Sequence, residues 1–268
     1  MKNRGIKLAK KALQNRPRRF SVIWMLPKFL TICALIFGLQ AMYQAIFNNW
    51  DNVIIMIIIA SVFDMLDGRV ARLLKSTSEF GMHLDSLSDF VVFGAVPAFS
   101  IYLWMDKPQG NFFWIVIVLY VICSALRLAR FNSELSERPN YAKNYFTGVP
   151  TPAAAFLMLF PIAIDEFLMS YNLKSFDIIA LWIGFISIAM VSNLPTFSGK
   201  VFQIPKSFVI PLLIILAILS NAIISNPIKG FIILVCVYLI GIPFASIFYL
   251  RLKKKAEALN IKINKQSL

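Results

Sequence analysis

The chain has little of what zinc-binding and disulfide-linked proteins require. It contains one histidine, His83, and three cysteines, Cys33, Cys123 and Cys236, each in a different apolar stretch and with no CxxC pair. Structural zinc sites need closely spaced Cys and His ligands, so a native zinc site is disfavoured. The cysteines predict no disulfide framework and are interpreted as small apolar packing residues. We interpret His83 as a structural residue at a helix boundary.

Charged residues are also scarce, at 15% of the chain, and the acidic ones are scarcest, with 13 Asp and Glu against 27 Lys and Arg. Hydrophobic residues make up 59% of the chain and the mean hydropathy is +0.72. These values exceed those of ordinary soluble domains. The composition therefore predicts an all-α integral membrane protein with no soluble domain attached.

Apolar stretches recur along the chain at close to the length of about 20 residues that a spanning helix needs. We expect one polytopic membrane domain over residues 21–251, between a basic segment at 1–20 and a basic tail at 252–268. We find no internal repeat and no low-complexity linker. The eight expected transmembrane helices lie at 29–47, 52–74, 82–104, 112–131, 150–169, 176–194, 207–225 and 230–250.

Basic residues favour one side of this topology. With a cytoplasmic N-terminus, all but three of the 27 Lys and Arg fall in cytoplasmic segments; the exceptions are Lys107, Lys174 and Lys229. This positive-inside pattern predicts that both termini are cytoplasmic. The basic clusters flank the membrane and meet anionic headgroups, so we expect no nucleic-acid partner despite the net charge of +14. Segment 1–20 is predicted as an interfacial helix or a topogenic tail, with no cleavable signal peptide.

Four aspartates gather in the stretch DMLDGRVARLLKSTSEFGMHLDSLSD, which begins at Asp64 and ends at Asp89. A charge at the bilayer centre costs at least ~2.5–3.5 kcal/mol, so acids here are candidates for function. Asp64 and Asp67 are three residues apart, and Asp85 and Asp89 are four apart, so each pair shares a helix face. A short loop predicts antiparallel helices on which the four carboxylates converge. This ligand set suits one or two hard cations, Mg²⁺, Mn²⁺ or Ca²⁺.

Small and basic residues lie among these acids. Gly68 and Ala71 allow a flat ligand to approach the helix backbone. The fork of Arg72 suits bidentate contact with a phosphate. Gly81 lies at the start of the second helix, and the sequence STSE at 76–79 matches a capping box led by the first serine.

The whole pattern, D-x2-D-G-x2-A-R-x8-G-x3-D-x3-D, resembles the signature of the CDP-alcohol phosphatidyltransferases. The resemblance implies a di-metal site at the cytoplasmic face, where a phosphatidyl group passes from a CDP-linked lipid to an alcohol with release of CMP. It implies a homodimer, metal ligands at Asp64, Asp67, Asp85 and Asp89, and Asp89 as the catalytic base. The residues implied to contact the CDP group are Asp67, Gly68, Ala71, Arg72, Ser78, Gly81 and Asp85.

The family motif P-N-x2-T on the first helix is here Pro27-Lys28-Phe29-Leu30-Thr31, so Lys28 replaces the usual asparagine. No Ser–His or Cys–His pairing is apparent, which disfavours a covalent phosphatidyl-enzyme and favours direct attack by the acceptor.

Two further stretches resemble the phosphatidylserine synthase branch of the family. They are DSLSDFVVFGAVPA, at 85–98, and the pair formed by LRLARFN and YFTGVPTPAAA, which end at Asn132 and Ala155. This branch implies CDP-diacylglycerol as donor and L-serine as acceptor. The alternatives are phosphatidylglycerophosphate synthase or another member of the family. A divalent-cation transporter is the non-enzyme alternative, and it is disfavoured because the acids lie on one hairpin near one face rather than on two repeated halves at the midplane.

Polar residues near the cytoplasmic end of the fourth predicted span are candidates for binding the acceptor. Arg127 and Arg130 are three apart, share one side of a helix, and could bind the acceptor carboxylate or a lipid phosphate. The alternative is that they snorkel to the interface as boundary arginines. Asn132 and Thr147 are candidates for further polar contacts. The sequence GVPTP at 148–152 is expected to shape the start of the next helix.

Overall fold

The computed structural model describes residues 25–76, 78–106, 111–134, 145–168, 174–192, 195–197, 221 and 225–244. The predictions for the basic segment 1–20 and the tail 252–268 lie outside the described residues. All but two residues of the predicted span 207–225 also lie outside them.

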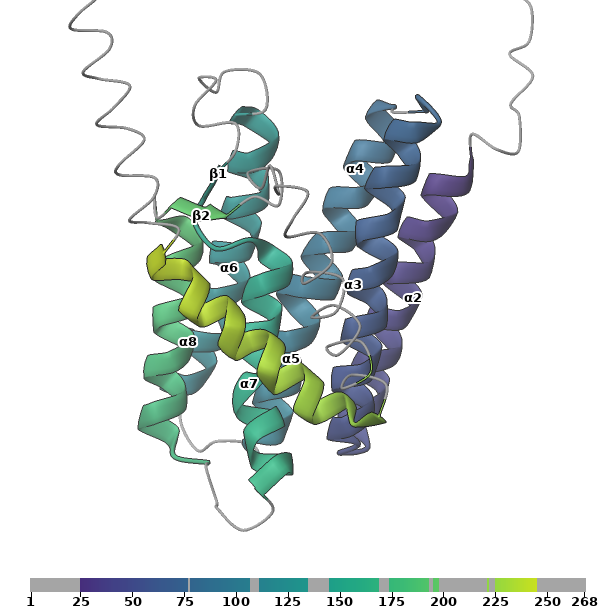
Figure 1. Ribbon diagram of the computed structural model, residues 1–268. Helices are drawn as coiled ribbons and strands as arrows, with labels where there is room; N and C mark the ends of the chain where they lie inside the picture. The colour runs from purple at the N-terminus through teal and green to yellow at the C-terminus, as the bar shows by residue number, and fades with distance from the viewer. Residues whose placement is uncertain are drawn as a thin grey trace, which may run out of the picture.

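Helices occupy the described parts of the other seven predicted spans (Figure 1). They are α2 (Leu26–Ile46), α3 (Trp50–Leu73), α4 (Glu79–Asp89) continued by the π-helix η2 (Phe90–Ala95) and α5 (Val96–Trp104), α6 (Asn111–Glu134), α7 (Thr151–Leu168), α8 (Phe176–Val191) and a C-terminal helix (Pro227–Phe244).

By length and composition, five helices within the described ranges could cross a membrane: α2, the continuous α4–η2–α5 helix, α6, α7 and the C-terminal helix. Helix α8 is apolar but has 16 residues. Helix α3 has 24 residues, and its second half carries Asp64, Asp67, Arg69 and Arg72. A largely helical chain with these apolar helices is consistent with an integral membrane protein.

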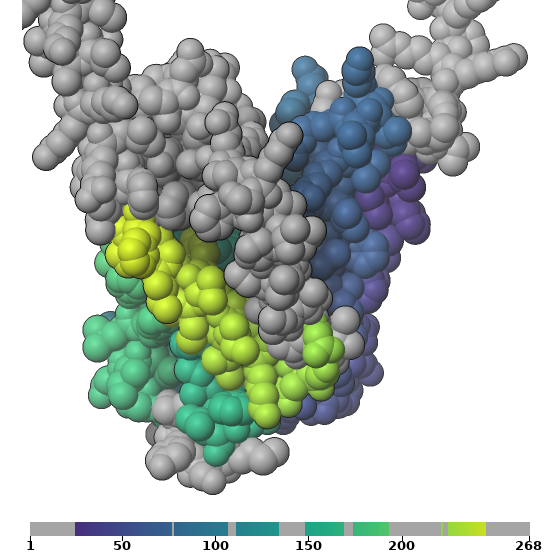
Figure 2. Space-filling model, viewed as in Figure 1, coloured from purple at the N-terminus to yellow at the C-terminus, as the bar shows by residue number. Residues whose placement is uncertain are grey.

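The helices form a bundle around η2, which contacts α2, α3, α6 and α7. Helix α2 packs mainly on α3, and α6 packs mainly on α8. The C-terminal helix crosses the bundle obliquely, and the space-filling view shows it lying over the front of α7 and α8 (Figures 1 and 2). Large buried side chains such as Trp104, Tyr120 and Phe93 fill the core.

The π-helix immediately after Asp89 has a local cause. Pro97 has no backbone N–H to donate to the carbonyl of Phe93, four residues earlier in the helix. The hydroxyl of Tyr120, on α6, donates to that carbonyl at 2.9 Å. Because a buried carbonyl without a donor is costly, this bond stabilises the π-helix η2, which directly follows Asp89.

In helix α7 a proline again leaves a backbone carbonyl without its helical N–H donor, and a side chain of a neighbouring helix supplies the donor. Pro161 lies inside the helix, and the indole N–H of Trp182 on α8 donates to the carbonyl of Leu157 at 2.9 Å. These two bonds tie neighbouring helices together at positions where the regular ladder is interrupted.

One short sheet accompanies the helices and was not predicted from the sequence. Strand β1 (Tyr145–Thr147) pairs antiparallel with β2 (Pro195–Phe197). Next to it, Gly148 has φ +77° directly before α7, and a Cβ there would lie 2.3 Å from the carbonyl oxygen of Met190. Glycine is therefore required where the chain turns into α7, against the end of α8.

Candidate active site

The aspartates of α3 and α4 converge near one end of the bundle. One carboxylate oxygen from each of Asp64, Asp67 and Asp85 lies within 4.8 Å of the other two. Asp89, one turn beyond Asp85, lies beside Asp64. The structure thus brings all four predicted acids into one small region. Carboxylates this close repel one another, and a divalent cation or a shared proton relieves the repulsion.

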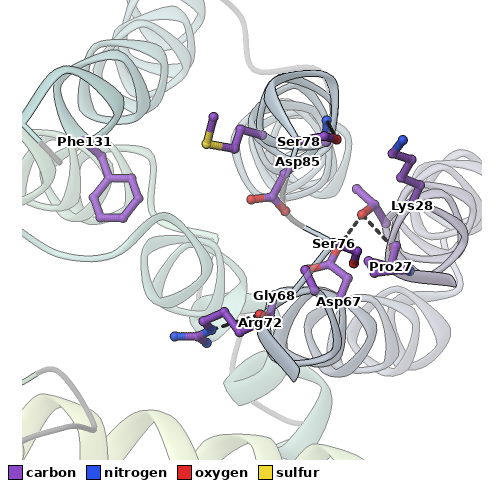
Figure 3. A pocket seen from close by; sticks show the side chains of 13 residues that line it. Pro27, Lys28, Asp67, Gly68, Arg72, Ser76, Ser78, Asp85 and Phe131 are labelled. Carbon is purple, nitrogen blue, oxygen red and sulfur yellow. Dashed lines mark hydrogen bonds between the residues drawn. The ribbon is translucent and has the colours of Figure 1, made fainter. Parts of the chain in front are cut away.

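Asp67 is the least solvent-exposed of the four, with 4% of its surface exposed. Its Oδ2 accepts a hydrogen bond from the hydroxyl of Thr31 on α2, at 2.5 Å (Figure 3). The hydroxyl of Ser88 on α4 donates to the backbone carbonyl of Thr31 at 3.4 Å. Thr31 therefore links α2 to both acid-bearing helices and holds the Asp67 carboxylate in one orientation.

A cavity of about 330 Å³ opens beside the acids, between α2, α3, α4 and the end of α6 (Figure 3). Its lining includes all seven residues predicted to contact a CDP group. Two predicted metal ligands, Asp67 and Asp85, belong to this lining, whereas Asp64 and Asp89 lie outside it. The full lining is Pro27, Lys28, Thr31, Asp67, Gly68, Ala71, Arg72, Ser76, Ser78, Gly81, Met82, Asp85 and Phe131.

Basic side chains border the cavity on two sides. The Nε–H of Arg72 donates to the carbonyl of Gly68 at 2.9 Å, which lays the side chain along its own helix. Across the cavity, the Lys28 ammonium lies 5.2 Å from the centre of the Phe80 ring. A cavity bordered by two cations and two carboxylates is suited to a polyanion that arrives together with divalent cations.

The capping box predicted for α4 was wrong in its first member. Ser78, not Ser76, is the N-cap, and its hydroxyl oxygen accepts a hydrogen bond from the backbone N–H of Gly81 at 3.1 Å. Ser76 is 5% exposed, lines the cavity, and its hydroxyl has no hydrogen-bond partner in the part of the chain described here. The polar group that a ligand could satisfy is therefore Ser76, the serine that the sequence pattern predicts as the cap.

The predicted acceptor residues Arg127, Arg130 and Asn132 are not part of the lining of this cavity. The Arg127 guanidinium donates to the hydroxyl of Thr151 at the start of α7. Arg130 donates to the carbonyl of Val191 at 3.3 Å, so it joins α6 to the end of α8. The side chain of Thr147 lies outside the described part of the structure.

Asn132 joins α6 to α4. Its side-chain amide donates to the Ser86 hydroxyl at 2.9 Å. Both residues, together with His83, line a second cavity of about 430 Å³ on the far side of α4.

Several residues lining the first cavity were not singled out from the sequence as binding residues. Thr31 and Lys28 were visible as part of the P-x3-T pattern, but neither was assigned a contact. Phe131 carried no recognisable signal, because an aromatic residue at a helix end is common at a membrane interface.

The chain is similar to known proteins of one family. A family described as CDP-alcohol phosphatidyltransferase matches residues 24–191. A CDP-diacylglycerol–serine O-phosphatidyltransferase of Mycobacterium bovis is 33% identical over 234 residues, which is 86% of this chain and 81% of the relative. Proteins of the same name from Helicobacter pylori J99 and Methanocaldococcus jannaschii are each 33% identical, over 64% and 65% of this chain and 71% and 75% of theirs.

Proposed function

The chain belongs to the CDP-alcohol phosphatidyltransferase family, and we propose on this premise that it transfers the phosphatidyl group of CDP-diacylglycerol to the hydroxyl of L-serine, giving phosphatidylserine and CMP. Family membership makes it a transferase of phospholipid synthesis. The names of its relatives support serine as the acceptor. The observation that carries the proposed chemistry is the convergence of Asp64, Asp67 and Asp85 beside a cavity lined by the motif residues.

The donor set fits divalent cations. Asp64, Asp67 and Asp85 offer hard oxygen ligands that already lie close together, and Asp89 adds a fourth negative charge. We assign these residues to hold one or two ions of Mg²⁺ or Mn²⁺, with Ca²⁺ as a further candidate. Such ions, when bound, supply positive charge that stabilises the phosphate oxygens during displacement.

The nucleotide end of the donor is assigned to the cavity. Gly68 and Ala71 leave room for it along α3, and Arg72, whose Nε–H already bonds to Gly68, offers its two terminal amino groups to phosphate oxygens. Arg72→Lys would keep the charge and lose the fork. Ser78 and Gly81 form the wall on the α4 side.

The reaction is proposed as a single displacement. The serine hydroxyl oxygen attacks the lipid-side phosphorus, the bond from that phosphorus to CMP breaks, and CMP leaves with the electron pair. Asp89 takes the serine proton. Because Asp64 contacts Asp89, the proton can be held between the two carboxylates.

We further propose the membrane arrangement expected from the sequence, with eight spans, both termini in the cytoplasm and the site at the cytoplasmic face of the cell membrane. Lys28, Arg69, Arg72 and Lys75 lie at the end of the bundle that holds the cavity, which supports this orientation. The family resemblance supports a homodimer.

An acceptor panel tests the proposed function. Purified protein is given CDP-diacylglycerol and Mn²⁺ with L-serine, glycerol 3-phosphate, inositol or choline, and the lipid product is identified by mass. We expect phosphatidylserine to form with stoichiometric release of CMP. Efficient use of glycerol 3-phosphate in place of serine would overturn the serine assignment and favour phosphatidylglycerophosphate synthesis.

A further inference from the structure

A second polar group lies in the apolar part of the bundle, where α6, α7 and the C-terminal helix meet. We call Arg127, Thr151 and Tyr238 the Arg127 cluster. The Arg127 guanidinium donates to the hydroxyl of Thr151, which is fully buried. Tyr238 on the C-terminal helix lies within electrostatic range of Arg127. Its hydroxyl is enclosed and has no hydrogen-bond partner among the described residues.

The Arg127 cluster lies deeper in the membrane than the cavity and on the same side of α6. Phe131 lines the cavity, and Arg127 is four residues earlier, so it shares that helix face one turn further from the end. The Asn132–Ser86 hydrogen bond sets the register between α6 and α4, which run in opposite directions (Figure 1). Arg127 is five residues before Asn132, about 7.5 Å along α6, and Asp89 is three residues after Ser86 along α4 in the same direction. Arg127 and Asp89 therefore lie at roughly the same depth in the bundle.

The chemistry of the Arg127 cluster suits an oxyanion. A guanidinium presents five N–H donors in a planar fork, and the Tyr238 hydroxyl adds another donor. Helix α7 begins at Thr151, and a helix N-terminus favours negative charge. A buried hydroxyl that lacks a partner is costly, and an incoming anion would satisfy it.

We propose that Arg127 and Tyr238 bind the carboxylate of the acceptor amino acid, so that the C-terminal helix completes the acceptor site. This inference rests on the proposed function. When its carboxylate is bound at the Arg127 cluster, L-serine presents its hydroxyl at the depth of Asp89, the residue proposed to take its proton. Tyr238 lies beyond residue 191, where the family match ends, so the motif residues do not reveal this contribution. A phosphate of the lipid donor offers the same oxyanion chemistry, and the test separates the two sources.

The test compares Tyr238→Phe with wild type in full kinetics for both substrates. The substitution removes one hydroxyl that has no partner within the described structure, so the thermal unfolding midpoint should be kept. We expect the KM for L-serine to rise roughly tenfold, as for the loss of one hydrogen bond to a charged group, with the KM for CDP-diacylglycerol unchanged. Tyr102→Phe is the matched control, because its ring packs on Trp114 away from the Arg127 cluster, and it should leave both constants unchanged.

Each outcome has a distinct meaning. A rise in the KM for CDP-diacylglycerol alone would assign the Arg127 cluster to a lipid phosphate and overturn the acceptor assignment. Unchanged constants in Tyr238→Phe, in a protein whose wild type uses serine, would overturn this inference and leave the proposed function standing. A wild type that does not use serine would overturn the proposed function itself.

Discussion

The substitution Gly68→Ala, in the lining of the cavity, should change the stability and the catalytic activity of the protein in opposite directions. Gly68 lies inside α3, is exposed, and lines the cavity, and a Cβ built there meets no protein atom within 4 Å. Alanine in a helix interior is more stable than glycine by about 0.5–1 kcal/mol. The protein should therefore unfold at a temperature roughly 2–4 °C higher per kcal/mol gained.

Catalysis should change in the opposite direction. The added methyl group projects into space that the nucleotide is proposed to fill, and overpacking costs about 1–3 kcal/mol. We expect kcat/KM for CDP-diacylglycerol to fall roughly tenfold or more, because 1.4 kcal/mol corresponds to a factor of ten. The assay is CMP release from CDP-diacylglycerol in detergent micelles, with the unfolding midpoint measured on the same preparation.

Gly184→Ala provides the matched control. Gly184 lies inside α8, and a Cβ there also meets nothing within 4 Å, but the residue is not part of the cavity lining. It should give a comparable stabilisation with full activity. A Gly68→Ala protein that is stabilised and fully active would refute the assignment of the nucleotide to this face of α3.

Three further changes test separate parts of the account. Asp67→Asn should abolish CMP release while the protein stays folded in detergent, and near-normal turnover would contradict the metal-site proposal. Ser76→Ala removes a buried hydroxyl that has no partner within the described structure, so it should leave the unfolding midpoint unchanged but raise the KM for CDP-diacylglycerol; a lowered midpoint with an unchanged KM would show a structural role instead. Tyr120→Phe leaves the Phe93 carbonyl without its donor and should destabilise the protein by about 1–3 kcal/mol, measured as a lower unfolding midpoint; an unchanged midpoint would refute the reading of η2.

The sequence predicted the helices and the grouping of motif residues because both depend on local spacing. Acids three and four residues apart share a helix face, and a short loop folds α4 back along α3. Gly68 and Arg72 likewise reach one cavity because they are four residues apart and share a face of α3. The apolar runs located the described helices within a few residues, whereas the span count and the orientation remain predictions.

Features that depend on contacts distant in sequence could not be predicted. The hydrogen bond that stabilises the π-helix comes from Tyr120, 27 residues from Phe93, and the short sheet joins residues 145–147 to residues 195–197. Which serine caps α4 depends on the path of the loop, and two candidates two residues apart cannot be distinguished by pattern alone. The approach of Tyr238 to Arg127 results from the oblique course of the C-terminal helix, which hydropathy does not encode.

The central claim is that the aspartate hairpin moves a phosphatidyl group directly to serine. The most direct measurement is the transfer of labelled L-serine into lipid by purified protein in vesicles containing CDP-diacylglycerol, with Mn²⁺ or with a chelator, for wild type and Asp85→Asn. We predict one phosphatidylserine for each CMP released, only with the cation and only in wild type, and no exchange of labelled CMP into CDP-diacylglycerol before serine is added. Equal transfer by folded Asp85→Asn, or rapid CMP exchange without serine, would contradict the account.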